Sequence, residues 1–287
     1  MISRRRFLAA AAASVAVPGV AAAQGINFTG IGQALLSAEK NRTGPVDHYL
    51  IGRQAAAELA AQAPLLPADH PLCDYVRKVV HTLALASNAP YVYQGPVVGI
   101  LDTNQINAYA MPGGFILLTT ELLKFLKSED ELAAMMGHEL GHIELQHALY
   151  EQKNAEAKKM FDQASNGRFA QSLNAMMPMI KTGYSIEIEA EADARATALC
   201  AAAGYDPRAL VTVLERFKAR TNSYGGAQYP LKRAEMVAKA SANLKVPSDD
   251  AIAARTARYQ QALTAPLQPP APPPAKPESA APTRKKK

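Results

Sequence analysis

The chain has 287 residues, of which 48% are hydrophobic and 20% are charged, and it contains no tryptophan. This length and composition suffice for one sizeable globular domain with a buried core. The formal net charge of +6 resides in the ends, because Arg4–Arg6 and the residues after Thr264 carry the excess of positive charge. The core between them carries about −1, which does not predict a nucleic-acid-binding protein.

The N-terminus has the features of an export signal. Arg4–Arg6 precede an alanine-rich apolar run, and an A-x-A pattern follows, so we predict that residues 1–23 are a signal peptide cleaved after Ala23. The stretch Ser3–Leu8 (SRRRFL) also resembles the bacterial twin-arginine export signal, which implies a periplasmic protein. An uncleaved membrane anchor is the alternative. No later segment approaches about eighteen consecutive apolar residues, so no transmembrane span is predicted in the mature chain.

Residues 45–118 alternate between helical and extended patterns. Helical periodicity covers 45–63 and 69–87, with a break at 64–67. Short strands are then predicted at 91–93, 96–101 and 115–118, the last after the turn Pro112–Gly114. The remainder is helical, with breaks near residues 167, 183, 204–207 and 225–226. The predicted fold class is mainly α (α+β), with a small sheet and one domain over 24–264.

The stretch Met136–His147 (MGHELGHIELQH) follows a capping box at Ser128–Glu131 that opens a helix. Histidines four residues apart share one face of a helix, so His138 and His142 can bind one metal ion. Glu139 lies beside them, close enough to act on a metal-bound water without being a ligand. This is the HExxH pattern, in which zinc acidifies water and the glutamate takes its proton. A pair of buried structural histidines is the alternative.

A catalytic zinc ion needs a third protein ligand. The metzincin pattern is excluded, because Leu145 and Ala148 stand where that class has glycine and histidine. If the helix continues, His147 lies about 140° around it from His142 and cannot reach the same ion. We therefore interpret His147 as a capping or core histidine, and we look for a carboxylate from a second helix.

Helical phase selects among the four carboxylates of residues 187–193. Glu189 and Asp193 fall on the apolar face of the predicted helix, whereas Glu187 and Glu191 fall on a charged face. Burial of a carboxylate is costly unless it is paired or metal-bound, so Glu189 is predicted to be the third ligand. Asp193, one turn later, is placed to accept the outer N–H of a ligand histidine. Glu191 is predicted to be solvated and to pair with Arg195.

Four ordered motifs resemble those of the minimal gluzincin peptidases: Asn107–Ile116 (NAYAMPGGFI), Glu131–His142 (ELAAMMGHELGH), Glu189–Asp193 (EAEAD) and Gly204–Pro207 (GYDP). That family includes the CAAX prenyl endopeptidases, the heat-shock membrane peptidases and the periplasmic peptidases of outer-membrane quality control. The resemblance implies a helical zincin domain in which His138, His142 and Glu189 bind one zinc ion. It also implies that Glu139 is the general base.

Two positions depart from the family pattern. Ile186 follows Ser185, where an arginine is usual, and Tyr229-Pro230 stands where the family usually has His-Pro. Tyr229 could donate its O–H to a developing oxyanion. A packed tyrosine is the simpler interpretation.

The predicted function is a zinc endopeptidase in which Glu139 deprotonates water and returns the proton to the leaving amine. Strand addition to the small sheet would read the backbone of an extended chain, which favours unfolded polypeptides as substrates. The family resemblance implies more specifically that these are unfolded or misassembled cell-envelope proteins. The alternative is a periplasmic chaperone-like binding protein with a restrained metal site, in which residues 154–183 form an apolar lid.

The C-terminal residues 265–287 are rich in proline and end in four basic residues, which predicts a disordered tail. Its lysines could contact anionic lipid or cell-wall polymer, giving a peripheral association with the envelope. Cys73 and Cys200 are predicted to be either a disulfide or two buried thiols, and their spacing does not decide between these.

Overall fold

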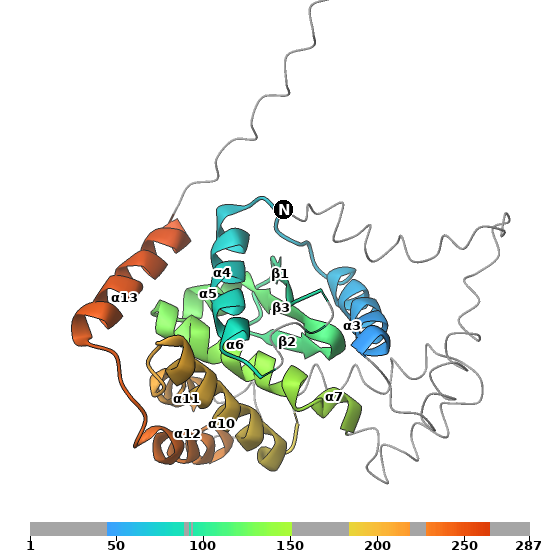
Figure 1. Ribbon diagram of the computed structural model, residues 1–287. Helices are drawn as coiled ribbons and strands as arrows, with labels where there is room; N and C mark the ends of the chain where they lie inside the picture. The colour runs from blue at the N-terminus through green and yellow to red at the C-terminus, as the bar shows by residue number, and fades with distance from the viewer. Residues whose placement is uncertain (1–44, 89–91, 93, 151–183, 219–227, 265–287) are drawn as a thin grey trace, which may run out of the picture.

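The computed structural model describes residues 45–88, 92, 94–150, 184–218 and 228–264 (Figure 1). The predicted signal peptide, the predicted tail and the segment 154–183 lie outside the described residues, as do the predicted breaks near 167, 183 and 225–226. These parts of the sequence analysis stay predictions.

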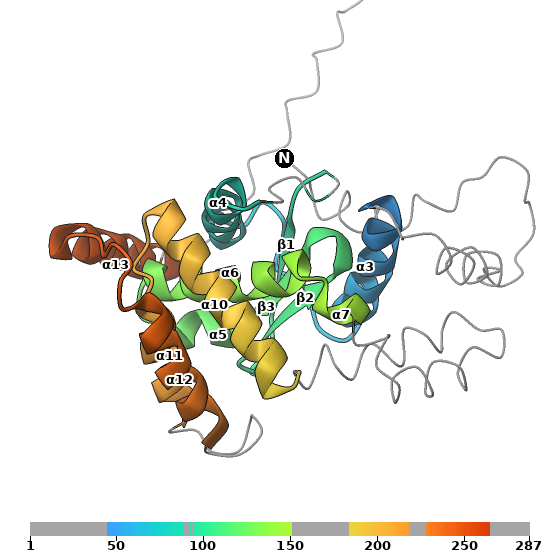
Figure 2. The ribbon, with the colours of Figure 1, turned by 60° about the horizontal axis from the view of Figure 1, so that its bottom comes forward.

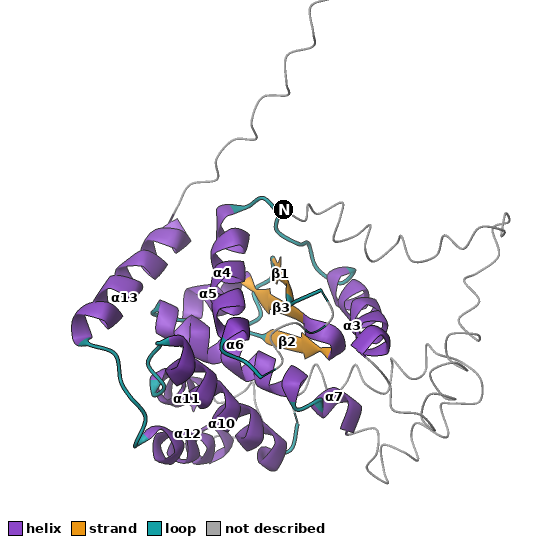
Figure 3. Cartoon of the chain, in the orientation of Figure 1, coloured by secondary structure: helices purple, strands orange, loops and turns teal. Residues whose placement is uncertain are grey.

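The described elements confirm a mainly helical protein with one small sheet (Figure 3). Before the motif helix come α3 (Pro45–Ala60), α4 (Pro71–Leu85), β1 (Val97–Leu101), β2 (Ala108–Met111), the short 3-10 helix η2 (Pro112–Gly114), β3 (Phe115–Thr119) and α5 (Thr120–Phe125). The motif helix and those after it are α6 (Glu129–Glu144), α7 (His147–Tyr150), α10 (Ile186–Ala203), α11 (Ala209–Lys218), α12 (Gln228–Ser241) and α13 (Asp249–Thr264).

The sheet has the strand order β1-β3-β2. β1 runs parallel to β3, with Val97 opposite Phe115, and β2 runs antiparallel, with Ala108 opposite Leu118. β2 is therefore an edge strand, and it contacts α6. Strands β1 and β3 lie where the sequence pattern predicts them, whereas β2 was not predicted, because its sequence AYAM contains two alanines and has little β propensity. The strand predicted at 91–93 falls largely outside the described residues.

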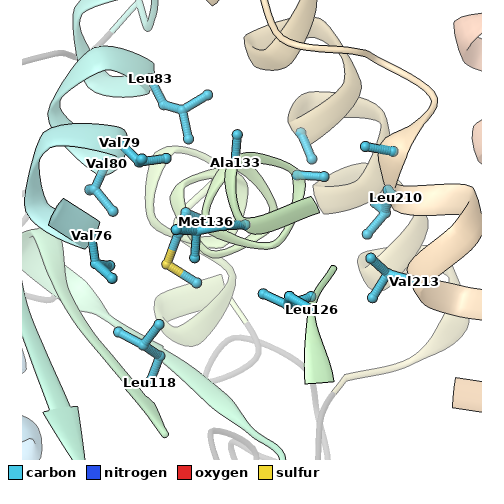
Figure 4. Packing of buried hydrophobic residues seen from close by; sticks show 14 of the residues in the cluster. Val76, Val79, Val80, Leu83, Leu118, Leu126, Ala133, Met136, Leu210 and Val213 are labelled. Carbon is cyan, nitrogen blue, oxygen red and sulfur yellow. The ribbon is translucent and has the colours of Figure 1, made fainter. Parts of the chain in front are cut away.

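Helix α6 runs through the centre of the molecule, with α4 and the sheet against one side and α10 and α11 against the other (Figures 1 and 2). Figure 4 shows the apolar side chains that surround it, which include Val76, Val79, Val80 and Leu83 of α4, Leu118 of β3, and Leu210 and Val213 of α11. Ala133 and Met136 of α6 are fully enclosed by this layer. A charged side chain on α6 is therefore largely buried, and it needs a partner.

The two cysteines are buried free thiols, Cys73 in α4 and Cys200 in α10. Burial raises the pKa of Cys73 to about 11, so its thiol stays protonated and unreactive at neutral pH. Of the two alternatives from the sequence, the structure has the buried thiols.

Helix α6 opens with three consecutive buried carboxylates, each paired with an arginine from a later helix: Glu129 with Arg258, Asp130 with Arg255 and Glu131 with Arg216. Asp130 accepts from Arg255 Nε at 2.9 Å and from the backbone N–H of Asp206 at 2.8 Å. Negative charge at a helix N-terminus is favourable. The pairs also attach α11 and α13 to the start of the motif helix.

Replacing Arg255 with alanine is expected to lower the free energy of unfolding by about 3 to 5 kcal/mol, because it leaves the Asp130 carboxylate buried without its counter-charge. Urea denaturation followed by circular dichroism measures this loss. Arg208→Ala is the control, since Arg208 is half exposed in its pair with Asp206 and should cost under about 1 kcal/mol. Equal effects of the two substitutions would contradict a special role for the buried pair.

Candidate metal centre

The predicted start of the motif helix is confirmed. Ser128 Oγ accepts from the backbone N–H of Glu131 at 3.1 Å, and α6 begins at the next residue. The Glu131 carboxylate reaches back to the N–H of Lys127 at 2.7 Å, one residue earlier than a capping box usually requires. From this start, α6 carries His138, Glu139 and His142 on its last two turns.

Two glycines of α6 let helix α10 approach closely. A Cβ at Gly141 would lie 2.9 Å from the carbonyl oxygen of Ala192 and 3.2 Å from its Cα. A Cβ at Gly137 would lie 3.3 Å from the Cα of Ala196. Any side chain at Gly141 would push the two backbones apart. The close approach places Glu189, on α10, beside the histidines of α6.

Gly141→Ala is expected to weaken metal binding and to destabilise the fold by about 1 to 3 kcal/mol, since the added methyl group collides with backbone rather than with a flexible side chain. Zinc competition with a chelator and urea denaturation measure the two effects. Ala198→Gly, on the exposed side of α10, should cost about 1 kcal/mol of helix stability and leave zinc affinity unchanged. Unchanged zinc affinity in Gly141→Ala would show that the site tolerates a wider helix spacing.

Three buried side chains converge between α6 and α10. His138 Nε2 lies 3.0 Å from His142 Nε2 and 3.3 Å from Glu189 Oε2, and His142 Nε2 lies 3.9 Å from Glu189 Oε1. The predicted phase of α10 is confirmed, because Glu189 is buried while Glu187 and Glu191 are exposed.

These separations fit a single small cation. Ligand atoms bound tetrahedrally to zinc at 2.0–2.2 Å lie about 3.3 to 3.6 Å apart, which is close to the spacing of these three groups. Among the described residues, His138, His142 and Glu189 form the group that could hold a metal ion. The donor set of two imidazoles and one carboxylate suits zinc.

The electrostatics of the three groups favour positive charge at their centre. Burial by itself lowers the pKa of His138, but Asp193 and Glu189 raise it to about 10. Burial by itself raises the pKa of Glu189, but the His138 hydrogen bond and the charges of His138 and Arg233 hold it well below its ordinary range. Burial and the charge of His138 lower the pKa of His142, which keeps that imidazole neutral with a free lone pair. A divalent cation would balance the negative charge of the Glu189 and Asp193 carboxylates and accept the lone pair of the neutral His142 imidazole.

Arg233 of α12 holds the acidic side of this site together, and the sequence analysis missed it. Its Nε and Nη2 each donate to Asp193 at 2.7 Å, and Nη1 lies 2.9 Å from Glu189 Oε2. Asp193 Oδ1 in turn lies 2.8 Å from His138 Nδ1, at the position predicted for it. Two carboxylates on a buried helix face do require a cation. The sequence contains 31 lysines and arginines, however, and no local pattern identifies Arg233 as the one that pairs with them.

Glu139 is buried beside the three converging groups, on the neighbouring position of α6. Burial, the largest effect, raises its pKa to about 7. A carboxylate with a pKa near neutral can accept a proton and give it up again under physiological conditions, as a general base must.

His147 is buried, in agreement with its interpretation as a core histidine, but it lies against His142 rather than away from it. Helix α6 ends at Glu144, and Gln146 has a φ of 57°, so the chain turns and the extrapolated helical phase does not apply. His147 is buried with its Nδ1 2.8 Å from His142 Nδ1. Its Nε2 lies 3.3 Å from Glu191 Oε2.

The predicted ion pair between Glu191 and Arg195 is wrong. Arg195 Nε instead donates to Glu144 Oε2 of α6 at 2.5 Å. Arg195 turns toward α6 because the two helices touch there, so a buried partner outcompetes the exposed carboxylate one turn earlier.

Tyr184 is a second residue that the sequence analysis did not select. Its ring stacks on His142 with a centroid distance of 4.7 Å, and its backbone N–H donates to Glu189 Oε1 at 3.0 Å. Tyr229, the predicted oxyanion donor, lies in the first turn of α12, and its side chain lies outside what the structure describes.

A cleft opens on the side of His142 that faces the sheet. Its walls include Met111 at the end of β2, Pro112 of η2, Ile143 of α6 and Tyr184. The cleft therefore lies between the end of the edge strand and His142, and apolar groups make most of its lining.

A helical domain in which an HExxH pair meets a glutamate of a second helix defines a metallopeptidase. The chain belongs to peptidase family M48, whose profile matches residues 73–261, more than half of its length. The resemblance seen in the sequence is thereby confirmed, and with it the class of enzyme. In the part of the chain that the structure describes, no helix has the length and apolar character needed to cross a membrane.

Several proteins are similar to this chain. The mitochondrial metalloendopeptidase OMA1 of Arabidopsis thaliana is 34% identical over 115 residues, which are 39% of this chain and 23% of that protein. A putative beta-barrel assembly-enhancing protease of Vibrio cholerae is 27% identical over 226 residues, 72% of this chain and 44% of that protein. The metalloprotease LoiP of Escherichia coli is 26% identical over 172 residues, 57% of this chain and 66% of that protein. The chain thus matches less than half the length of the first two relatives.

Proposed function

We propose that this metallopeptidase is a zinc-dependent endopeptidase with one zinc ion per chain, held by His138, His142 and Glu189. The observation that carries the proposal is the convergence of these three buried donors, with separations of 3.0–3.9 Å, next to a fourth buried group, the carboxylate of Glu139. Two imidazoles and one carboxylate leave one position open in a tetrahedral site, which is typical of catalytic rather than structural zinc.

The residues divide the chemistry between them. A bound zinc ion would supply the Lewis acidity that acidifies water and polarises the scissile carbonyl. Glu139 accepts the proton of the attacking water and delivers it to the leaving amine, a task for which its raised pKa is suited. Asp193 and Arg233 keep His138 oriented. Arg233 holds the Asp193 carboxylate in place, and this carboxylate faces the outer nitrogen of His138.

The substrate is proposed to be an extended polypeptide of the cell envelope. β2 is an edge strand next to α6, so an incoming chain can add to it through backbone hydrogen bonds and place a side chain in the apolar cleft by His142. Backbone recognition of this kind selects unfolded or misassembled proteins. The predicted export signal and the similarity to the putative beta-barrel assembly-enhancing protease of Vibrio cholerae support the periplasm as the place of action.

Metal analysis of the purified protein, together with casein digestion, tests the proposal. We expect one zinc ion per chain, loss of digestion after treatment with a strong chelator, and recovery when zinc is added back. Undiminished digestion by the metal-free protein would refute zinc-dependent proteolysis. A preparation with stoichiometric zinc that cleaves no unfolded substrate would refute the endopeptidase role but not the metal site.

A further inference from the structure

The outer nitrogens of the two histidines in the proposed zinc site face different partners. His138 Nδ1 faces the Asp193 carboxylate, which Arg233 neutralises, at 2.8 Å. His142 Nδ1 faces the Nδ1 of another imidazole, that of His147, also at 2.8 Å. A ligand histidine ordinarily donates its outer N–H to a carboxylate, a carbonyl or water, so the second arrangement is unusual.

We propose that His147 is a positioning residue, which accepts the outer N–H of His142 and so keeps the inner nitrogen of His142 free for the metal. Glu191 completes the arrangement by accepting the remaining N–H of His147. The inference rests on the proposed function, because it assigns a role to His147 only if His142 binds a metal ion.

The positions of the protons follow from counting them. A neutral imidazole has one N–H and one lone pair, so only one of the two facing nitrogens can carry the proton between them. If His142 carries it on Nδ1, its Nε2 lone pair points at His138 and Glu189 and can bind a metal ion. If His147 carries it on Nδ1, His142 must be protonated on Nε2, and the inner position is blocked.

Glu191 selects the productive arrangement. Its carboxylate oxygen Oε2 is a hydrogen-bond acceptor that lies 3.3 Å from His147 Nε2, so it favours the form of His147 with the proton on Nε2. In that form, His147 Nδ1 has a lone pair and can only accept. The exposed Glu191 therefore acts on the metal ligand through a buried imidazole.

The local fold holds His147 in this place. Gln146 has a left-handed backbone conformation that ends the helical course directly after α6, and the rings of His142 and His147 meet nearly edge to face, at 74° and 4.9 Å between centroids. Tyr184 stacks on His142 and also lies 6.0 Å from the ring of His147. His147 is 3% exposed, so water does not compete for the contact.

Substitutions at position 147 separate hydrogen bonding from packing. His147→Leu fills a similar space with an apolar side chain but removes the Nδ1 acceptor, so zinc affinity is expected to fall about 10- to 100-fold. His147→Asn places an amide oxygen near the position of the His147 Nδ1 atom. Because this oxygen can accept the hydrogen bond from His142, zinc affinity should return to within a few-fold of that of the unaltered protein. His81→Leu, on the exposed side of α4, is the matched control and should change nothing.

Zinc affinity is measured by chelator competition, and thermal unfolding of the metal-free proteins reports on folding separately. Unaltered affinity in His147→Leu would overturn the proposal, and so would an equal loss in His147→Asn, since packing alone would then explain the effect. If the unaltered protein binds no zinc, the proposed function itself is wrong, and the role of His147 falls with it.

The Glu191 pair keeps the proposal testable should His147→Leu fail to fold. Glu191→Ala should weaken zinc binding a few-fold, while Glu191→Gln should not, because an amide oxygen still accepts from His147 Nε2. Glu187→Ala, equally exposed on α10, is the control. Identical zinc affinity in Glu191→Ala and Glu191→Gln would show that Glu191 does not act on His147 through a hydrogen bond.

Discussion

Glu139→Gln is expected to retain one zinc ion per chain and to lose peptidase activity by about 10²- to 10⁴-fold, the range typical of a lost general base. The amide is nearly isosteric with the carboxylate and can still accept hydrogen bonds, but it cannot take a proton from water. Rates of casein or peptide cleavage and zinc content, measured on the same preparation, test both halves. Glu187→Gln is the control, since Glu187 is exposed at the start of α10.

The same variant separates proteolysis from the alternative of a chaperone-like binding protein. If cells that carry Glu139→Gln show the full function of the unaltered gene product, binding rather than cleavage is what the cell requires. If activity in vitro persists within about tenfold, less than a general base usually contributes, the role assigned to Glu139 is wrong.

Glu189→Ala is expected to remove zinc almost entirely, because two imidazoles and water bind the ion much more weakly than a complete three-ligand site. The substitution also leaves the Arg233 guanidinium 2.9 Å from the vacated carboxylate position, where its charge repels a cation. Glu187→Ala should keep zinc stoichiometric because its side chain is exposed, and Glu191→Ala should also keep the site occupied, since its expected loss of affinity is only a few-fold. Zinc content after gel filtration distinguishes these outcomes.

Asp193→Ala should lie between these extremes, with zinc affinity lowered about 10- to 100-fold, since His138 loses the partner of its outer nitrogen. If Glu191→Ala empties the site while Glu189→Ala keeps stoichiometric zinc, the metal approaches from the exposed face of α10. The roles of Glu189 and Asp193 would then both be wrong.

Much of the site is predictable from the sequence because its elements depend on residues close together in the chain. A helix of 3.6 residues per turn places His138 and His142 on one face, and the same period separates Glu189 and Asp193 from the exposed Glu187 and Glu191. The start of α6 is likewise local, since Ser128 caps the N–H of Glu131 three residues later. Periodicity also predicted β1 and β3, although it missed the short edge strand β2.

The tertiary structure alone decided which distant groups complete the site. Arg233 and Glu189 are far apart in sequence and meet only because α12 packs against α10, and the distance between α10 and α6 depends on the absence of a side chain at Gly141. His147 reaches His142 because the helix stops and turns at Gln146, where an extrapolated helical period no longer holds. Sequence periodicity states which face of an element is buried, whereas the identity of the opposing group depends on long-range packing and on which charge the buried site leaves uncompensated.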